Sequence, residues 1–298
     1  MKAGLETSDS FVKVKNIKTP DIFSRRFKTN VQNLDNAFCA DGWVPGCTFT
    51  INGTPGSGKT TLLCQMLQKL AENGKKVAYI SGEESIHQLA YNCKRINATD
   101  ISVANMNDLL KVKDVVKREN FDFIILDSFP CFHMPGIFRT TKDREHAAVE
   151  CVLSTAHESE CVVGCVLHVT KTGTYKGSTL LPHAVDANYS LTKDETEEGV
   201  RYLDAMKNRF GTSSKSAFKM TATGFTFENL ATQEASNSTC IDKALNFLNK
   251  NNNAGIKFAD AVKLYGSVDT AYIALRDGVL SFKIRQLGSG NNIFWVKY

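Results

Sequence analysis

Two patterns of apolar residues alternate along the first two-thirds of the chain. Short runs rich in apolar and β-branched residues predict buried strands at 47–53, 75–81, 121–127 and 161–170. Longer stretches with apolar residues at helical spacing predict helices at 60–73, 84–96, 106–120 and 144–159. Because helices alternate with buried strands, we expect an α/β domain with a mainly parallel sheet.

The pattern changes toward the C-terminus. Residues 185–192 and 200–208 predict a hairpin around the acidic turn KDETEEG, and the polar, aperiodic stretch 229–239 predicts a linker. Beyond it, helical patterns cover 241–250, 256–266 and 269–278, and strand patterns cover 281–287 and 292–298. Three helices and a hairpin suggest a winged helix. We therefore divide the chain into a basic N-terminal segment (1–28), a core (29–228), the linker (229–239) and a small winged-helix-like domain (240–298).

Composition narrows the class of protein. Of the 298 residues, 42% are hydrophobic and 22% are charged, which is ordinary for a soluble globular protein. No long apolar run predicts a membrane span, and the N-terminus lacks the apolar core of a signal peptide. The 9 cysteines are scattered without a C-x-x-C pair, so we expect reduced thiols, no zinc and no disulfide. The net charge of +5 does not by itself require a polyanionic partner.

The segment GTPGSGKT matches the phosphate-binding pattern G-x-x-x-x-G-K-[ST] between a predicted strand and a predicted helix. Its glycines let successive backbone N–H groups point at phosphate oxygens, and the helix N-terminus adds its positive dipole end. Lys59 should reach the β and γ phosphates of ATP, and the Thr60 hydroxyl should hold Mg²⁺. The expected nucleotide-binding residues are Gly53, Thr54, Pro55, Gly56, Ser57, Gly58, Lys59, Thr60 and Thr61.

Carboxylates follow two of the predicted strands. Asp127 ends the run FDFIILD, at the carboxyl end of a strand, where it could hold the metal ion or merely cap the next element. Glu83 and Glu84 follow the strand after the phosphate-binding loop. We expect Glu83 to orient the attacking water, whereas Glu84 could equally be the N-terminal charge of the next helix. The loop itself shows no obvious additional cation in the sequence around it.

The order of these motifs resembles the RadA (Sms) branch of the RecA-like ATPases. The matching segments, within residues 25–228, are RFKTNVQNLDNAFCADGWVPGCTFTINGTPGSGKTTLL, VAYISGEES, FIILDS, HVTKTG, LPHAVDANYSL and KNRFG. The resemblance implies a RecA fold and assembly into rings or filaments with ATP at the subunit interfaces. It also implies single-stranded DNA binding and motor activity on recombination intermediates. It covers the core only, and we expect the family's zinc module and Lon-like domain to be absent.

Two cations, Lys207 and Arg209, lie one residue apart at the end of a predicted strand, so both should face the same side. They match the family's KNRFG motif, whose cations are expected to reach the ATP site of the neighbouring subunit. An arginine suits this role because its planar fork binds phosphate oxygens in pairs. A plain exposed cationic strand end is the alternative. His168 matches the family's sensor between nucleotide and DNA, although a core histidine with satisfied hydrogen bonds would look the same.

Two basic loops are candidates for DNA contact or are simply surface loops. The segment 171–177 is short, basic and glycine-rich, and its tyrosine could stack on a base. The segment 130–144 is the second candidate. The expected DNA-binding residues are Arg139, Lys142, Arg144, Lys171, Tyr175 and Lys176. The C-terminal domain could bind duplex DNA through Lys263, Arg276, Lys283 or Arg285, or it could bind a protein partner.

We therefore expect a cytoplasmic ATPase, nucleoid-associated in a bacterial or phage-infected cell. It should act as an oligomeric, DNA-stimulated motor, helicase-like, on recombination or replication intermediates. One alternative is a strand-exchange recombinase that forms filaments, for which FVKVKNIKTPDIF (11–23) is a weak candidate polymerisation segment. Another is a KaiC-like signalling ATPase or a loader that binds a protein partner.

Overall fold

The computed structural model describes residues 11–168, 180–211 and 215–227, together with three short strands near the C-terminus. The chain divides into two compact units, Met1–Glu228 and Asn229–Tyr298. The first unit is built on one sheet of nine strands in the order β3-β2-β4-β5-β1-β6-β7-β8-β9. The strands from β3 to β6 are parallel, and those from β6 to β9 pair antiparallel. This arrangement confirms the predicted α/β core with a mainly parallel sheet.

The strands of this sheet are short, and those in its centre are almost wholly buried. Their bounds are β1 Thr48–Asn52, β2 Val77–Ser81, β3 Ser102–Asn105, β4 Phe123–Asp127, β5 Val162–Val166, β6 Ala187–Lys193, β7 Val200–Asn208, β8 Lys215–Thr221 and β9 Gly224–Thr226. The predicted hairpin is present as β6 and β7. The strand predicted at 161–170 ends at Val166, so His168 lies in the segment that follows it.

The helices connect these strands, and three of them begin with a side-chain cap. Their bounds are α1 Gln32–Phe38, α2 Lys59–Glu72, α3 Ile86–Arg95, α4 Leu109–Glu119, α5 Thr141–Ser159 and α6 Leu180–Ala184, with 3-10 turns at η1 Val14–Asn16, η2 Asp21–Phe23 and η3 Phe129–Cys131. Ser85 and Thr140 each form a capping box, and Asp108 caps α4. These caps satisfy backbone N–H groups that have no partner inside the helix.

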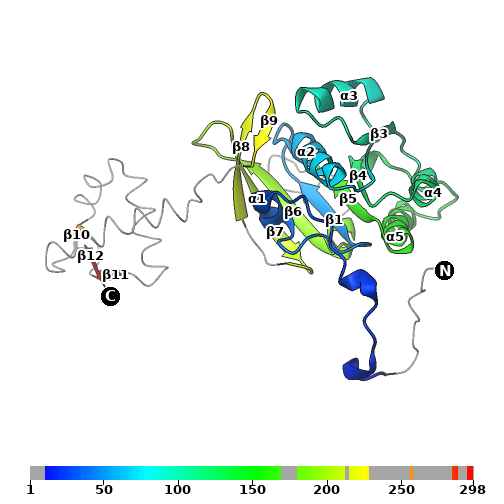
Figure 1. Ribbon diagram of the computed structural model, residues 1–298, viewed down its shortest axis with the longest axis horizontal. Helices are drawn as coiled ribbons and strands as arrows, with labels where there is room; N and C mark the ends of the chain where they lie inside the picture. Colours follow the sequence, from blue (N-terminus) through cyan, green and yellow to red (C-terminus); the bar gives the residue numbers. More distant parts are fainter. Residues whose placement is uncertain are drawn as a thin grey trace. The chain divides into compact units, whose positions relative to one another are not determined.

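Helices cover both faces of the sheet, because its buried strands alternate apolar side chains between the two faces. On one face α1, α2 and α3 pack against residues such as Phe49, Tyr79 and Phe123. On the other face α4, α5 and α6 pack against residues such as Ile124 and Cys165. Figure 1 shows this layered arrangement, with α4 and α5 side by side at one end of the sheet. The sheet therefore separates two apolar cores.

Several short elements of the core were not predicted from the sequence. Strand β3 lies at the edge of the sheet and has only half-buried or exposed residues, so it lacks the apolar run that marks a buried strand. Strands β8 and β9 extend the sheet at the other edge. In β8 only Phe218 is buried, and β9 has only 3 residues. Helices α1 and α6 have 7 and 5 residues, too few to give a clear periodic pattern.

The second unit contains a three-stranded sheet in the order β10-β12-β11, formed by Ile256–Lys257, Phe294–Lys297 and Ile284–Leu287. Strands β11 and β12 pair antiparallel, as the predicted hairpin requires. The helix predicted at 256–266 is wrong at its start, because Ile256 and Lys257 pair with β12 instead. Most of the second unit lies outside the described residues. The linker and the other two helices predicted for the winged-helix-like domain belong to that part.

The close packing of β5 against its neighbours gives a test of the fold. A Cβ on Gly164 would lie 2.3 Å from Cζ of Phe49 and 2.6 Å from Cδ1 of Ile125, inside a core with no room to shift. We expect Gly164→Ala to lower the free energy of unfolding by about 3 kcal/mol, measured by urea denaturation. Gly74→Ala is the control, because open space surrounds Gly74 and only its φ of +75° is strained, at about 1 kcal/mol. Equal losses in the two variants would contradict this packing.

Candidate nucleotide-binding site

A cleft of about 320 Å³ lies at the carboxyl edge of the parallel strands, where β1, β2, β4 and β5 end. Most of the residues that the sequence indicated for phosphate, metal and water line this cleft. Its lining residues are Pro55, Gly56, Gly58, Lys59, Thr60, Thr61, Ser81, Glu83, Glu84, Asp127, His168 and Met220. The fold therefore brings together, from separate elements, Lys59 and Thr60, Glu83, Asp127 and His168.

The phosphate-binding loop connects β1 directly to α2. Gly53 is required at its start, since a Cβ there would lie 2.3 Å from the carbonyl oxygen of Leu191. Gly58 caps α2 in the left-handed conformation, with a φ of 102° that favours glycine. Lys59 is only 6% exposed, and its ammonium donates to the carbonyl oxygens of Gly53 at 2.8 Å and Thr54 at 3.3 Å. Burial lowers the pKa of Lys59, and the charge of Asp127 opposes that change.

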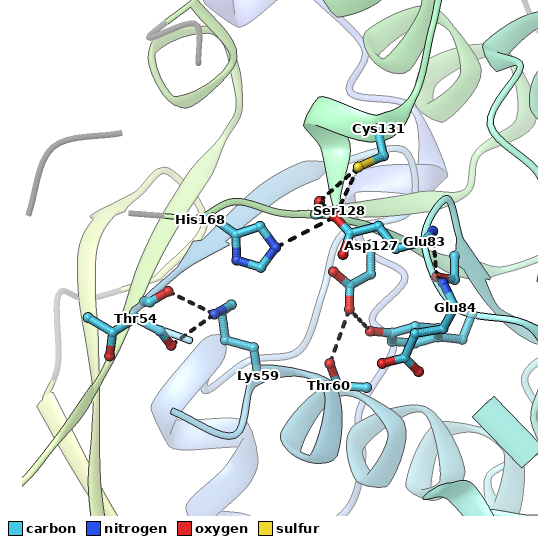
Figure 2. Close-up of polar contacts among 12 residues, drawn as sticks. Thr54, Lys59, Thr60, Glu83, Glu84, Asp127, Ser128, Cys131 and His168 are labelled. Atoms are coloured by element: carbon cyan, nitrogen blue, oxygen red, sulfur yellow. Dashed lines mark hydrogen bonds and ion pairs between the residues drawn. The ribbon is translucent and has the colours of Figure 1, made fainter. Parts of the chain in front are cut away.

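The candidate metal ligands meet across the cleft. The Thr60 hydroxyl donates to Oδ2 of Asp127 at 3.1 Å, and the Tyr79 hydroxyl donates to the same oxygen (Figure 2 shows the Thr60 contact). Tyr79 is fully buried in β2, and burial raises its pKa, so the phenol remains a neutral donor. Sequence reasoning missed Tyr79, although alternation along VAYIS places it on the sheet face that packs against α2.

Two neighbouring carboxylates have opposite environments. Glu83 accepts hydrogen bonds at Oε1 from the Cys131 thiol at 2.9 Å and the Ser128 hydroxyl at 2.5 Å, and these donors lower its pKa. Burial raises the pKa of Glu84, and the charges of Asp127 and Glu83 raise it further. The arrangement keeps Glu83 ionised and makes a proton easier to hold on Glu84. The ionised form of a carboxylate is the one that can accept a hydrogen bond or a proton from water.

His168 completes the wall of the cleft. Its Nε2 lies 3.9 Å from Oε1 of Glu83, and Figure 2 shows the imidazole between Lys59 and this carboxylate. Within the described residues, three buried polar side-chain atoms have no hydrogen-bond partner, and they are Oγ of Ser57, Oε2 of Glu84 and Nδ1 of His168. All three belong to the phosphate-binding loop or to the cleft. Buried polar atoms normally have partners, so their concentration here fits a site that receives a polar ligand.

The residues present fit ATP with Mg²⁺. A backbone loop with a buried lysine suits phosphate groups, and a threonine hydroxyl with a carboxylate supplies the oxygen ligands that Mg²⁺ prefers. Thr60 and Asp127 would hold the metal ion, and Lys59 would contact the phosphates.

Lys207 and Arg209 lie away from this cleft. The Lys207 ammonium donates to the carbonyl oxygens of His183 at 2.9 Å and Val185 at 2.5 Å, and Arg209 donates to Oδ1 of Asp186 at 3.2 Å. Asp186 in turn accepts from the backbone N–H of Thr48, the first residue of β1. The phosphate-binding loop follows the opposite end of β1, roughly 13 Å along the strand. Both cations therefore face the side of the domain opposite their own cleft.

Two other cations do lie beside the loop, which corrects the expectation that the loop has no additional cation. Nε of Arg201 donates to the carbonyl oxygen of Ser57 at 3.2 Å. The Lys193 ammonium lies 3.4 Å from the position that a Cβ on Gly56 would take. Lys193 ends β6 and Arg201 lies at the start of β7, both far from the loop in sequence. Only the antiparallel hairpin of the folded chain places them next to it.

The candidate DNA-binding residues are divided between two loops. Arg139, Lys142 and Arg144 are exposed in or next to the segment that joins β4 to α5, and the Arg144 guanidinium lies 5.8 Å from the ring centre of Phe138. Because β4 ends in the cleft, this segment begins next to Asp127. Lys171, Tyr175 and Lys176 lie outside the described residues.

Fold and site together define a P-loop ATPase core of the RecA type. Residues 27–124 match the family model described as the KaiC ATPase. RadA of Campylobacter jejuni, a DNA repair protein, is 33% identical over 207 residues, which cover 67% of this chain and 45% of the relative. RadA of Escherichia coli is 31% identical over 206 residues, with 67% and 44% covered. RadA proteins are therefore homologues of this core, as the resemblance predicted, and the chain spans about half of their length.

Solved structures show the same fold at lower identity. A KaiC-like protein from Pyrococcus horikoshii matches with a TM-score of 0.53 at 20% identity, covering 67% of this chain and 97% of that chain. The RadB recombinase matches with a TM-score of 0.50 at 20% identity, covering 67% and 98%. These matches confirm the RecA-like fold. Among the described residues, no helix is long and apolar enough to span a membrane.

The Tyr79 hydroxyl provides a test of the metal site. Tyr79→Phe removes one donor to Asp127 while leaving the buried ring in place. Partners that orient a metal-binding carboxylate typically change metal affinity by about 10-fold or more, so we expect the Mg²⁺ concentration for half-maximal ATP binding to rise about 10-fold. Calorimetric titration of ATP at a series of Mg²⁺ concentrations measures it. Tyr91→Phe, at an exposed position on α3, is the control, and an unchanged Mg²⁺ dependence in Tyr79→Phe would contradict the assignment.

Proposed function

We propose that this protein hydrolyses ATP and couples hydrolysis to movement on single-stranded DNA during recombination or replication. The observation that carries the proposal is the meeting of Lys59, Thr60, Asp127 and Glu83 in one cleft, from three separate parts of the chain. Glu83 orients a water for in-line attack on the γ-phosphate and accepts its proton. Lys59 stabilises the negative charge on the phosphates, and Thr60 and Asp127 hold Mg²⁺, which when bound neutralises part of that charge.

The catalytic site of this proposal is completed by a second copy of the chain. Arg209 has a side chain that is 58% exposed and lies outside its own cleft, which supports a role toward a neighbouring subunit. In the N-terminal segment, Phe11 and Val14 are almost wholly exposed, and burial against another copy would remove them from water. A head-to-tail contact of this kind generates rings or filaments. Arg209 would then stabilise charge on the transferring phosphoryl group from outside.

Single-stranded DNA is the proposed substrate of the motor. The RadA homologues are named as DNA repair proteins, and the exposed cations at 139, 142 and 144 follow the strand that ends in the ATP site. A ligand on this segment could therefore influence Asp127 through a short stretch of chain. His168 lies near Glu83 and precedes the basic segment 171–177, which gives a second route between the two ligands.

Mixing two inactive variants tests the shared site. Lys59→Ala disables the phosphate-binding loop, and Arg209→Ala disables the donated cation. In a random mixture of subunits, about a quarter of the interfaces pair an intact loop with an intact arginine, so we expect about a quarter of the wild-type ATPase rate. Each variant alone should hydrolyse ATP at least about 100-fold more slowly than the wild type.

The control for the mixture is the double variant Lys59→Ala/Arg209→Ala mixed with either single variant. Every interface then lacks either an intact phosphate-binding loop or an intact arginine, so the mixture should not regain ATPase activity. A mixture of the two single variants that stays inactive, although light scattering shows that the subunits exchange, would contradict donation in trans.

DNA stimulation tests the substrate. We expect single-stranded DNA to raise the ATPase rate at low salt, and its apparent affinity to fall steeply as salt increases, because phosphate binding releases counterions. The slope of log affinity for DNA against log salt concentration measures the number of bound phosphates. Neutralising Arg139, Lys142 and Arg144 together should make this slope shallower by about one unit for each phosphate that is no longer bound. Lys117→Ala, at an exposed cation on α4, should keep the wild-type slope. ATP hydrolysis that DNA does not stimulate at any salt concentration would favour a KaiC-like signalling ATPase or a protein-binding loader.

A further inference from the structure

Cys131 differs from the other cysteines of the first unit. Among the described cysteines it alone is partly exposed, and the seven others are buried. It ends the 3-10 turn η3, which follows β4, and its thiol points toward the ATP cleft (Figure 2). The function proposed above assigns no role to this side chain.

The thiol contacts the carboxylate that we assign to water activation. Sγ of Cys131 lies 2.9 Å from Oε1 of Glu83, and the hydroxyl of Ser128 lies 2.5 Å from the same oxygen. His168 also faces Oε1, at 3.9 Å. In the described part of the chain all three of these contacts are made to Oε1. The other carboxylate oxygen of Glu83, Oε2, can therefore contact a water or a ligand. One oxygen of the carboxylate is thereby anchored by two hydrogen-bond donors.

The backbone around Cys131 is built for this contact. The N–H of Cys131 donates to the carbonyl oxygen of Ser128 at 2.9 Å, which closes η3. The N–H of Gly82 donates to the carbonyl oxygen of Asp127 at 2.8 Å, which ties the segment after β2 to the end of β4. A Cβ on Gly82 would lie 3.0 Å from Cβ of Cys131, so the absence of a side chain at Gly82 allows the two segments to approach closely. These two backbone hydrogen bonds therefore hold the segments that carry the thiol and the carboxylate close together.

We propose that Cys131 is a positioning residue for ATP hydrolysis, and that its thiol, as a neutral hydrogen-bond donor, orients the Glu83 carboxylate toward the attacking water. This inference rests on the proposed function. A neutral donor suits the place, because it adds no charge to a cleft in which Asp127 and Lys59 already face the expected positions of the metal ion and the phosphates. A cation at position 131 would compete for those phosphates. Burial and the adjacent carboxylate raise the pKa of Cys131, so the thiol stays protonated at neutral pH.

Substitutions at position 131 separate the hydrogen bond from the space that the side chain fills. Cys131→Ala removes the donor, and Cys131→Ser restores one. Because a single neutral hydrogen bond contributes a modest free energy, we expect kcat of the alanine variant to fall about 3-fold to 10-fold, with KM for ATP unchanged. The serine variant should keep at least about half of the wild-type kcat. Cys131→Val, which fills a similar volume without a donor, replaces alanine if thermal unfolding shows that the alanine variant has lost its fold.

A double-variant cycle with Glu83→Gln locates the effect. If the thiol acts through Glu83, adding Cys131→Ala to Glu83→Gln should not lower the residual rate further. A normal kcat in Cys131→Ala and Cys131→Val, or equal losses in the alanine and serine variants, would overturn the positioning role while leaving the proposed function intact. A wild-type protein that does not hydrolyse ATP, or a Glu83→Gln variant as fast as the wild type, would instead overturn the proposed function.

Discussion

The pairing of β2 with β4, in register at Ser81 and Asp127, sets the geometry on which the cleft depends. The Ser81 hydroxyl accepts from the backbone N–H groups of Glu83 at 3.1 Å and Glu84 at 2.8 Å, so the turn that carries both carboxylates is fixed to the end of β2. Asp127 lies across from that same end. A slip of one residue would turn Asp127 to the other face of the sheet and separate it from Thr60. The buried apolar residues of both strands prevent such a slip.

The cleft concentrates carboxylates, and the protein controls their charge through neighbouring groups. Hydrogen bonds lower the pKa of Glu83, while burial and the nearby negative charges raise the pKa of Glu84. The two residues are adjacent in sequence, so their difference comes from what each side chain contacts. Neutral donors at and just before η3 reach Glu83, whereas Glu84 is half-buried and close to the charges of Asp127 and Glu83. One environment thus keeps a carboxylate ionised, while the other favours the protonated form of its neighbour.

The cations at the end of β7 connect the interior of the domain to its surface. Asp186 binds Arg209 through one carboxylate oxygen and the start of β1 through the other. Strand β1 leads at its opposite end into the phosphate-binding loop. A neighbouring subunit that takes Arg209 from Asp186 would therefore act on the strand that carries the loop. The same carboxylate thus contacts both an exposed arginine and the buried start of the strand that carries the loop.

Residue types and their spacing were enough to predict the phosphate-binding loop, the carboxylates at 83 and 127 and the alternation of helices with buried strands. These features are local: each depends on residues at fixed intervals next to an apolar run. The side chains that surround them could be found only in the folded chain. Tyr79, Cys131 and Ser128 contact the carboxylates of the cleft because parallel strands end at one edge, and no local pattern encodes that meeting. The edge strands β3 and β8 were missed for a related reason, since pairing with a neighbour forms them where burial is too slight to leave a pattern, and β9 has only 3 residues.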